Sequence, residues 1–320
     1  MGLLLARQRP HRVLGHHLMN SGALASNLFN ALSLGSILLL IALGLAITFG
    51  LMRVINMAHG EFIMAGAYAT YVTQNFFQSK FPNFIGWYLI ASIPFAFCVA
   101  ALLGWLLEAT VIRRLYGRPL DTLLATWGVS LILQQLARTI FGSLGVNVQS
   151  PAWLGGNWKL GESLVVPHER VFIMAVALGC LAGMGIFLYY SQVGRRIQAV
   201  MQNRDMASCL GISTRKVDAL AFSVGSGLAG IAGCALTMLS SIDSNVGTKY
   251  IIDSFMVVVL GGVGSLAGAV AGALGMGVLN TVWEYETTAS LGRVLTFVCV
   301  ILFLQWKPQG LVATRSRALD

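Results

Sequence analysis

Charged residues are scarce in this sequence. Only 10% of the 320 residues are Asp, Glu, Lys or Arg, whereas an ordinary soluble domain carries roughly 25%. Hydrophobic residues make up 56%, and the mean hydropathy is +0.75. This balance excludes a soluble globular enzyme and a disordered chain. Together with the 36 glycines, it predicts an all-α, polytopic integral membrane protein, because glycine is more frequent in membrane helices than in soluble ones.

Motifs for catalysis and metal binding are also missing. The sequence contains no GxxxxGK[ST] phosphate loop and no HExxH, so it does not bind ATP through a Walker A motif and is not expected to be a zinc enzyme. The five cysteines stand singly without CxxC spacing, so we predict small buried apolar side chains for them: Cys98, Cys180, Cys209, Cys234 and Cys299. No catalytic residue, metal or cofactor is predicted.

The excess of positive charge follows the loops. There are 21 Lys and Arg against 12 Asp and Glu, a formal net charge of +9. These basic residues fall in short segments between apolar runs instead of clustering on one face, as they would in a nucleic-acid-binding protein. The distribution indicates membrane topology and no nucleic-acid partner.

Apolar intervals almost free of charge locate the membrane spans, since about 20 apolar residues are needed to cross the hydrocarbon core. We expect spans at about 29–52, 62–79, 81–107, 122–137, 171–193, 219–242, 254–283 and 289–306. The domain organisation is then a basic extension (1–25), a membrane domain (26–306) and a basic tail (307–320). Glu108, at the end of the third span, is expected to pair with Arg113 or Arg114.

Sidedness follows from the positive-inside rule. The arginine-rich loop 194–216 and the basic tail are predicted to be cytoplasmic, and the longest polar loop, 142–170, to lie outside. If the chain crosses the membrane eight times and loop 194–216 is cytoplasmic, both termini lie on the outer side. This count conflicts with a cytoplasmic tail. Either the interval 254–283 contains a half-helix and a full helix, or a break near 56–60 places the amino terminus inside. We therefore expect 8–10 segments.

A glycine run is the expected position of the first of these breaks. Gly261, Gly262 and Gly264 stand close together, and broken backbone at membrane depth requires protein or a cavity to satisfy it. The alternative is close helix packing, because Gly264, Gly268 and Gly272 lie four residues apart. The two interpretations are compatible.

Polar residues within the spans are candidates for a translocation path, since ionisable groups at membrane depth are costly. Asn56, His59 and Glu61 lie between the first two spans. They either line a path or stabilise the start of the second helix, with Asn56 as a cap and Glu61 in the first turn. A further alternative is that Glu61 pairs with Arg53 or His59.

The fourth span carries a polar stripe. Thr126, Ser130 and Gln134 repeat every four residues and therefore share one helical face. Together with Trp127, they offer neutral donors and acceptors to a small polar solute. The alternative is hydrogen bonding between helices, worth roughly 0.6 kcal/mol per contact.

The arginine-rich loop has an amphipathic pattern. Its apolar residues recur at helical spacing and predict an exposed apolar face outside the bilayer: Ile197, Val200, Met201, Met206 and Leu210. Such a face requires a partner groove. The alternative is an amphipathic helix on the membrane surface.

Five stretches carry a resemblance to a known family: GLAITFGLMRVINMAHGEFIMAGAYATYV (44–72), YGRPLDTLLATWGVSLILQQ (116–135), RRIQAVMQNRDMASCLGI (195–212), YIIDSFMVVVLGGVGSLAGA (250–269) and FLQWKPQGL (303–311). They resemble permease subunits of ABC importers for branched-chain amino acids and, more closely, for urea. INMAHGEF and VVVLGGVG look common to the wider family, and LATWG, MQNRDMASC and YIIDSFMV look like the urea-type branch. Residues 1 to about 25 lie outside the resemblance.

The resemblance implies that 194–212 is the loop coupled to a cytoplasmic ATPase. Ala207 and Gly211 match the Ala-xxx-Gly core of that loop, whereas the leading Glu-Ala-Ala is missing. The implied loop residues are Gly194, Arg195, Arg196, Ala199, Asn203, Arg204, Ala207 and Gly211. The implied partners are ABC ATPase subunits, a second homologous permease, a periplasmic solute-binding protein and the lipid bilayer of the bacterial inner membrane.

The expected function is therefore ATP-driven import of a small polar solute. Urea is the first expectation, because the resemblance to the urea-type branch implies it. Chemistry supports it, since a neutral solute needs only amide, hydroxyl and indole groups and, apart from Glu61, the spans keep their charges at the ends. A branched-chain amino acid is the alternative. A different class, an ATP-independent channel or secondary transporter, would be marked by clear internal repeats, and none is evident. An intramembrane enzyme would need a nucleophile and base, and none is visible.

Overall fold

The computed structural model describes residues 21–52, 56–159 and 165–312. Within these ranges the chain is an all-α bundle, as predicted, and five of its segments are long and apolar enough to cross a membrane. The nine longer helices are α1 (Ser21–Met52), α2 (His59–Lys80), α3 (Tyr88–Thr110), α4 (Pro119–Phe141), α5 (His168–Tyr190), α8 (Thr214–Leu236), α9 (Val246–Gly261), α10 (Leu266–Glu286) and α11 (Ala289–Trp306).

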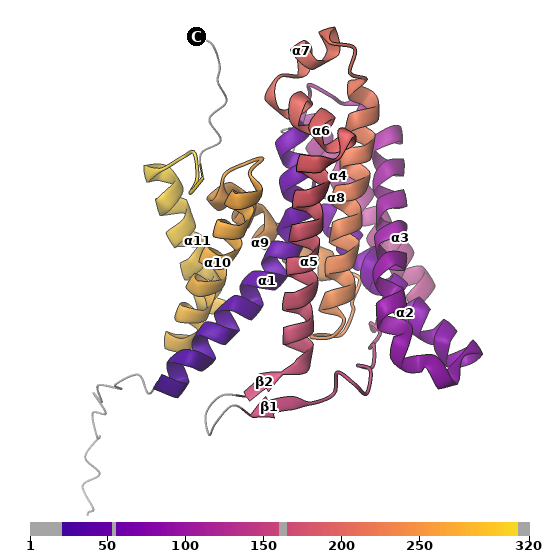
Figure 1. Cartoon of the computed structure of the whole chain (residues 1–320), viewed down its shortest axis with the longest axis vertical. Helices are drawn as coiled ribbons and strands as arrows, with labels where there is room; N and C mark the ends of the chain where they lie inside the picture. Colours follow the sequence, from indigo (N-terminus) through magenta and orange to yellow (C-terminus); the bar gives the residue numbers. More distant parts are fainter. Residues whose placement is uncertain (1–20, 53–55, 160–164, 313–320) are drawn as a thin grey trace, which may run out of the picture.

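Shorter elements lie at the two ends of the bundle (Figure 1). The helices α6 (Gln192–Gln202) and α7 (Arg204–Cys209) cover one end. A small antiparallel hairpin of β1 (Asn157–Lys159) and β2 (Val165–Pro167) lies at the other, with Trp158 opposite Val166. The 3-10 helices η1 (Pro82–Trp87) and η2 (Ile112–Arg114) flank α3.

Helix α8 is the centre of the core and packs against α1, α2 and α3. Small residues permit this approach. A Cβ atom on Gly66 of α2 would lie 2.1 Å from the carbonyl oxygen of Gly230 on α8. Any residue with a Cβ would clash at this distance, so the close approach requires glycine at position 66. Phe62 and Phe222 then stack edge to face with ring centroids 6.1 Å apart.

The seventh interval contains two helices, α9 and α10, and the break falls at the predicted glycines. Gly262 has φ +107° and Gly264 φ +78°, conformations that favour glycine. Close packing occurs as well, because a Cβ on Gly272 would lie 2.3 Å from the carbonyl oxygen of Val257. Both interpretations of the glycine run are therefore correct.

Two helices begin in the middle of the bundle. A Cβ on Gly44 would lie 3.2 Å from His59 Cε1 at the start of α2, and Gly44 is about 12 Å from the end of α1 at 1.5 Å per residue. A Cβ on Gly60 of α2 would lie 2.4 Å from the carbonyl oxygen of Gly247 on α9. The first turns of α2 and α9 therefore meet inside the bundle.

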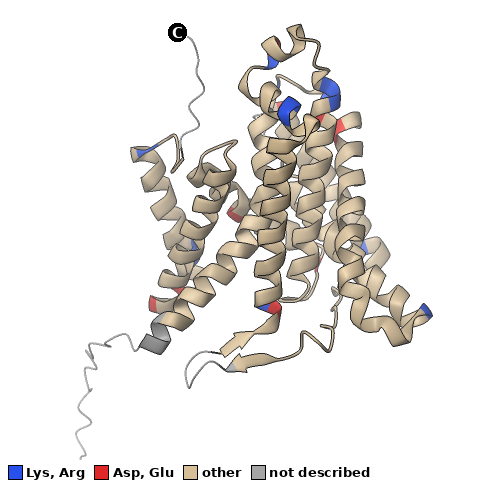
Figure 2. Ribbon diagram, in the orientation of Figure 1, with Lys and Arg blue, Asp and Glu red and all other residues tan. Residues whose placement is uncertain are grey.

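The two described ends of the chain lie at opposite ends of the bundle. Lys and Arg gather around α6 and α7 (Figure 2), and α11 ends on that side, whereas α1 begins on the side of the hairpin. The extra helix produced by the α9–α10 break thus resolves the parity conflict. The second predicted break, near residues 56–60, also exists as a turn at residues 56–58. It does not place the amino-terminal end of α1 on the side of the bundle that carries α6. Of the predicted extension and tail, residues 1–20 and 313–320 lie outside the described residues.

Two local predictions have clear outcomes. Glu108 pairs with Arg113, with 2.8 Å between Oε2 and Nη2. The prediction of buried cysteines is wrong for Cys98 and Cys209, which are exposed, and correct for Cys234, whose sulfur lies 3.1 Å from Ser92 Oγ. Cys98 lies on an outer face of α3 and Cys209 ends α7, so neither is covered by the chain's own core.

Candidate functional site: a buried polar network and a cytoplasmic loop

The polar stripe of α4 is the buried face of that helix. Thr126, Ser130 and Gln134 are buried, while Leu124 and Ile132 on other faces are exposed. This inverted distribution is expected of a membrane helix whose polar groups face protein and whose apolar groups face lipid or another subunit. The stripe therefore faces the start of α2, as the path and the hydrogen-bonding interpretations both require.

Glu61 of α2 is the acceptor at the centre of the network. Its side chain is 1% exposed, and its Oε1 accepts hydrogen bonds of 2.8 Å from Ser130 Oγ and from Gln134 Nε2. Gln134 Nε2 also lies 3.1 Å from Thr248 Oγ1 on α9. The second carboxylate oxygen, Oε2, has no partner among the described residues. Three helices are thus joined through Glu61 and Gln134.

The turn before α2 holds the other predicted residues. Asn56 Oδ1 accepts from the Ala58 amide at 3.0 Å, and Thr126 Oγ1 accepts from the Met57 amide at 3.2 Å. Asn56 therefore supports the turn, but the N-cap residue of α2 is Ala58 without a side-chain cap bond, so the prediction of Asn56 as the cap is wrong. Glu61 lies in the first turn of α2, as predicted, and its carboxylate points to α4.

His59 lies apart from this network. It is fully buried, its ring stacks edge to face on Phe62, and neither ring nitrogen has a hydrogen-bond partner within the described ranges. The suggested pairing of Glu61 with His59 is therefore absent, and the alternative partner, Arg53, lies outside the described residues.

A pocket of about 330 Å³ opens beside the network. Trp127, which is 52% exposed, contributes to its wall along with the predicted Ser130 and Gln134. Its remaining lining residues are Met57, Leu131, Asn245, Thr248, Lys249 and Ile251. The pocket thus combines an amide, hydroxyls, an indole, an ammonium group and apolar side chains.

Sequence reasoning missed the contribution of α9. Asn245, Thr248 and Lys249 precede the seventh apolar interval and lie outside every predicted span. Arg138 of α4 anchors this segment, since its Nε and Nη2 atoms donate to Ser244 Oγ and Asn245 Oδ1, both at 2.8 Å. The available signal was the polar run 240–249 directly before a broken span.

The predicted cytoplasmic loop folds as two capped helices. Ser191 Oγ accepts from the Gly194 amide at 2.8 Å to begin α6, and Asn203 Oδ1 accepts from the Met206 amide at 2.9 Å to begin α7. A Cβ on Gly194 would lie 2.2 Å from the carbonyl oxygen of Phe187. Gly194 therefore serves the packing of α6 on α5.

Gly211 ends α7. Its φ is +80°, its amide donates to the carbonyl of Ser208 at 3.0 Å, and the Ile212 amide donates to that of Ala207 at 3.1 Å. This pair of bonds is a Schellman C-cap, which requires a left-handed residue at the position of Gly211.

The predicted apolar face of the loop is divided. Ile197 and Val200 of α6 are buried in the chain's own core, so the prediction of one continuous exposed face is wrong. Met206 and Leu210, in contrast, are 59% and 75% exposed at the far end of the molecule. Arg195 and Arg196 are also exposed, while Ala207 is buried and Ala199 is half-buried. The strongly exposed residues of the predicted apolar face are therefore those of the α7 end, Met206 and Leu210.

Arg204 fixes α7 to the bundle. Its Nη1 lies 3.3 Å from Asp218 Oδ1, its Nη2 also donates to that carboxylate, and its guanidinium lies 4.9 Å from the ring centroid of Tyr116. Burial would lower the pKa of Arg204, but the hydrogen bonds and charge of Asp218 raise it overall. The arginine stays charged and bound.

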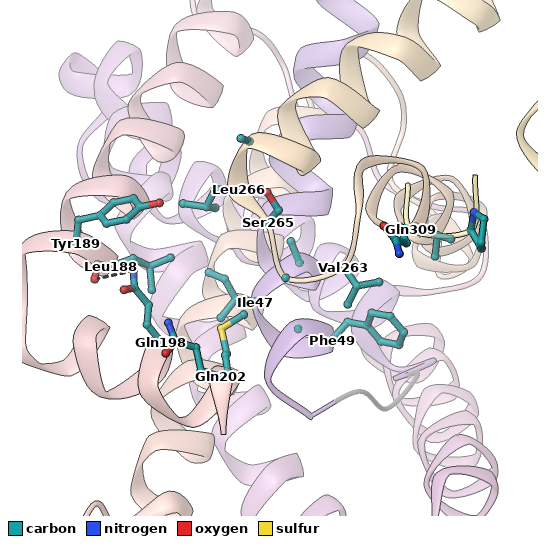
Figure 3. Close-up of a pocket in the computed structure, with 17 residues that line it drawn as sticks. Ile47, Phe49, Leu188, Tyr189, Gln198, Gln202, Val263, Ser265, Leu266 and Gln309 are labelled. Atoms are coloured by element: carbon teal, nitrogen blue, oxygen red, sulfur yellow. Dashed lines mark hydrogen bonds between the residues drawn. The ribbon is translucent and has the colours of Figure 1, made fainter. Parts of the chain in front are cut away.

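A larger pocket, of about 1000 Å³, lies between α6 and the α9–α10 turn. Gln198 and Gln202 enter it from α6, Ser265 and Leu266 from the turn, and Gln309 from the segment after α11 (Figure 3). Gln198 is held by a 3.2 Å bond to the carbonyl of Leu188. The two pockets lie at opposite ends of α9.

Comparisons with known proteins extend over most of the chain. A family model described as "Branched-chain amino acid transport system / permease component" matches residues 27–304. The permease protein LivH of a high-affinity branched-chain amino acid transport system in Escherichia coli K12 is 30% identical, covering 89% of this chain and 94% of LivH. BraD of Pseudomonas aeruginosa, a permease protein of such a system, is 29% identical over the same shares of both chains.

A more distant similarity concerns a second type of permease. The Escherichia coli K12 permease protein LivM, also of a high-affinity branched-chain amino acid transport system, is 24% identical over 88% of this chain and 68% of LivM. No solved structure matches the chain. The expected urea-type assignment is not supported by these comparisons.

Proposed function

We propose that this chain, which belongs to the family of branched-chain amino acid transport system permease components, moves its substrate through the pocket between α2, α4 and α9. The chain is a multi-pass protein of the inner membrane and a translocation subunit. The observation that carries the proposal is the Glu61 network, in which three helices place buried polar groups beside an open pocket. Two of these helices begin inside the bundle, an arrangement typical of transporter binding sites.

The chemistry of the pocket favours a branched-chain amino acid. A zwitterion presents a carboxylate and an ammonium group. Lys249 lies on the wall of the pocket, where its ammonium group pairs with Asp243 at 2.6 Å, and the buried Glu61 Oε2 has no partner among the described residues. Leu131, Ile251 and Met57 offer an apolar surface to an aliphatic side chain. Lys249, which precedes the seventh apolar interval in the sequence, thus reaches the pocket because α9 starts early.

Urea is the second candidate substrate. Gln134, Ser130 and Trp127 supply neutral amide, hydroxyl and indole groups on the same wall, and these suffice for a small planar solute. The names of the relatives weigh toward an amino acid.

The energy for transport is proposed to come from separate ATPase subunits. The exposed Met206 and Leu210 on α7 provide a compact apolar surface that fits a groove on such a subunit. The residues proposed to form this coupling surface or to hold its shape remain Gly194, Arg195, Arg196, Ala199, Asn203, Arg204, Ala207 and Gly211. A second homologous permease would cover the open side of the α4–α9 pocket, and a solute-binding protein would dock at loop 142–170.

The test is uptake of labelled leucine and labelled urea into proteoliposomes that contain the chain with its ATPase subunits, second permease and binding protein. ATP-dependent leucine uptake that excess urea does not inhibit is expected. Urea uptake that leucine does not inhibit would reassign the substrate. Uptake that persists without the ATPase subunits would assign the chain to the channel or secondary-transporter class.

Lys249→Met examines the proposed carboxylate contact in the same assay. We expect a raised KM for leucine with a smaller change in kcat, because the lost charge acts on substrate binding. The matched control is Lys80→Met, at the exposed end of α2 and away from the pocket.

A further inference from the structure

Arg204 joins three parts of the molecule that are separate in the sequence. It is the first residue of α7, it binds the carboxylate of Asp218 through two nitrogens, and its guanidinium lies over the ring of Tyr116. The side chain of Asp218 is fully buried in the first turns of α8. Tyr116 lies in the short connection between η2 and α4.

This connection leads directly into the helix of the polar network. Pro119 begins α4 three residues after Tyr116, and the same helix continues through Thr126, Ser130 and Gln134. The start of this connection is fixed to α3, because Arg113 of η2 binds the buried Glu108 of α3. Arg204 therefore contacts the connection between the residue that is fixed to α3 and the first residue of α4.

The chemistry of the contact is suited to transmitting a displacement. A guanidinium has a planar fork that binds a carboxylate through two nitrogens and stacks on an aromatic face at the same time. A lysine ammonium keeps the charge but offers neither the fork nor the plane. Helix α7 has only six residues, so its orientation depends on this side chain and on the two caps.

We infer that Arg204 is a positioning residue that couples movement of α7 to movement of α4, with Asp218 as its anchor and Tyr116 as its contact to the α4 connection. The inference rests on the proposed function, since it assumes that α7 is the surface an ATPase moves. It assigns to Arg204 a role in transmission inside this chain, not a contact with the ATPase.

The experiment compares variants in the complete complex, reconstituted in proteoliposomes, by measuring leucine uptake and ATP hydrolysis in the same sample. Arg204→Lys is expected to lower the number of molecules imported per ATP hydrolysed by about fivefold or more. Tyr116→Leu is expected to act in the same direction, and Tyr116→Phe, which keeps the ring, much less. Arg118→Ala is the control, because it removes an exposed arginine two residues from Tyr116 whose guanidinium pairs with Asp121 at 3.8 Å.

A second measurement separates transmission from folding. Spin labels on the native Cys209 of α7 and on Leu124→Cys of α4, with the other cysteines replaced by alanine, report the distance between the two helices. In the parent chain α7 and α4 are expected to move together. The distance between the two labels should therefore change between the nucleotide-free and ATP-bound complexes by less than the displacement of α7. In Arg204→Lys the two helices should move independently.

The possible outcomes are distinct. If the parent complex imports nothing in response to ATP, the proposed function fails together with this inference. If the parent is ATP-driven and Arg204→Lys keeps the full import ratio, the inference alone is wrong. Loss of assembly in Arg204→Lys would assign Arg204 to folding and would also overturn it.

Discussion

Gln134 Nε2 on α4 lies 2.8 Å from Glu61 Oε1 on α2. The two residues are 73 positions apart in the sequence, and their contact joins a helix whose outer faces are apolar to a helix that starts inside the bundle. Because the same amide nitrogen lies 3.1 Å from Thr248 Oγ1, one side chain connects three helices at the pocket. Changes at this position should therefore affect transport more than changes at its neighbours.

Gln134→Ala tests this expectation directly. It removes one of two donors to a buried carboxylate, a loss that costs about 1–3 kcal/mol when the acceptor stays buried. We expect uptake to fall by about tenfold or more. The control is Gln135→Ala, which changes the same residue type on the exposed side of the same turn. Equal uptake in the two variants would remove Gln134 from the site.

The meeting of α2 and α9 can be tested through Gly60. Gly60→Ala would bring a Cβ to 2.4 Å from the carbonyl oxygen of Gly247, so the two helix starts must separate. Overpacking of this kind costs typically about 1–3 kcal/mol, and thermal unfolding in detergent should occur at a lower temperature. Gly128→Ala on α4 is the control, because nothing lies within 4 Å of its Cβ position and alanine is the better helix former.

Gly211 tests the shape of α7. Gly211→Val is expected to insert normally but to uncouple ATP hydrolysis from uptake, because a β-branched residue is strained at φ +80°. Gly211→Asn should retain most of the coupling, since asparagine tolerates the left-handed region. Undiminished, ATP-coupled uptake by Gly211→Val would show that the C-cap of α7 has no part in coupling.

The exposed apolar residues of α7 test the docking surface. The double variant Met206→Ser with Leu210→Ser should lose most co-purification with the ATPase subunits, because the contact would no longer bury apolar area. Tyr190→Ser, which removes another strongly exposed side chain at the same end of the molecule, should retain it. Full retention by the double variant would indicate that α7 lies on the membrane surface instead.

Periodicity predicted the features that depend on one helix. The spacing of Thr126, Ser130 and Gln134 identified the buried face of α4, and the positive-φ glycines Gly262 and Gly264 fall where the sequence predicted a break. These features follow from local geometry, namely 3.6 residues per turn and the conformational freedom of glycine.

Features that depend on packing between distant segments could not be predicted in this way. Lys249 and Thr248 are polar residues at the end of a loop in the sequence, and they reach the site because α9 starts in the middle of the bundle. Likewise, the amphipathic pattern of the loop does not reveal that Ile197 packs into the chain's own core while Leu210 is exposed. Helical periodicity identifies an apolar face but not the partner that covers it.

The most direct test of the path is the accessibility of Thr248. In the complete complex, Thr248→Cys in a chain without other cysteines would be treated with a membrane-impermeant thiol reagent from the outer and from the cytoplasmic side, with and without ATP. The account predicts labelling from one side in each nucleotide state and protection by leucine, whereas Leu136→Cys on the outward face of α4 should show neither dependence. Labelling of Thr248→Cys that is unaffected by both ATP and leucine would contradict a path through this pocket.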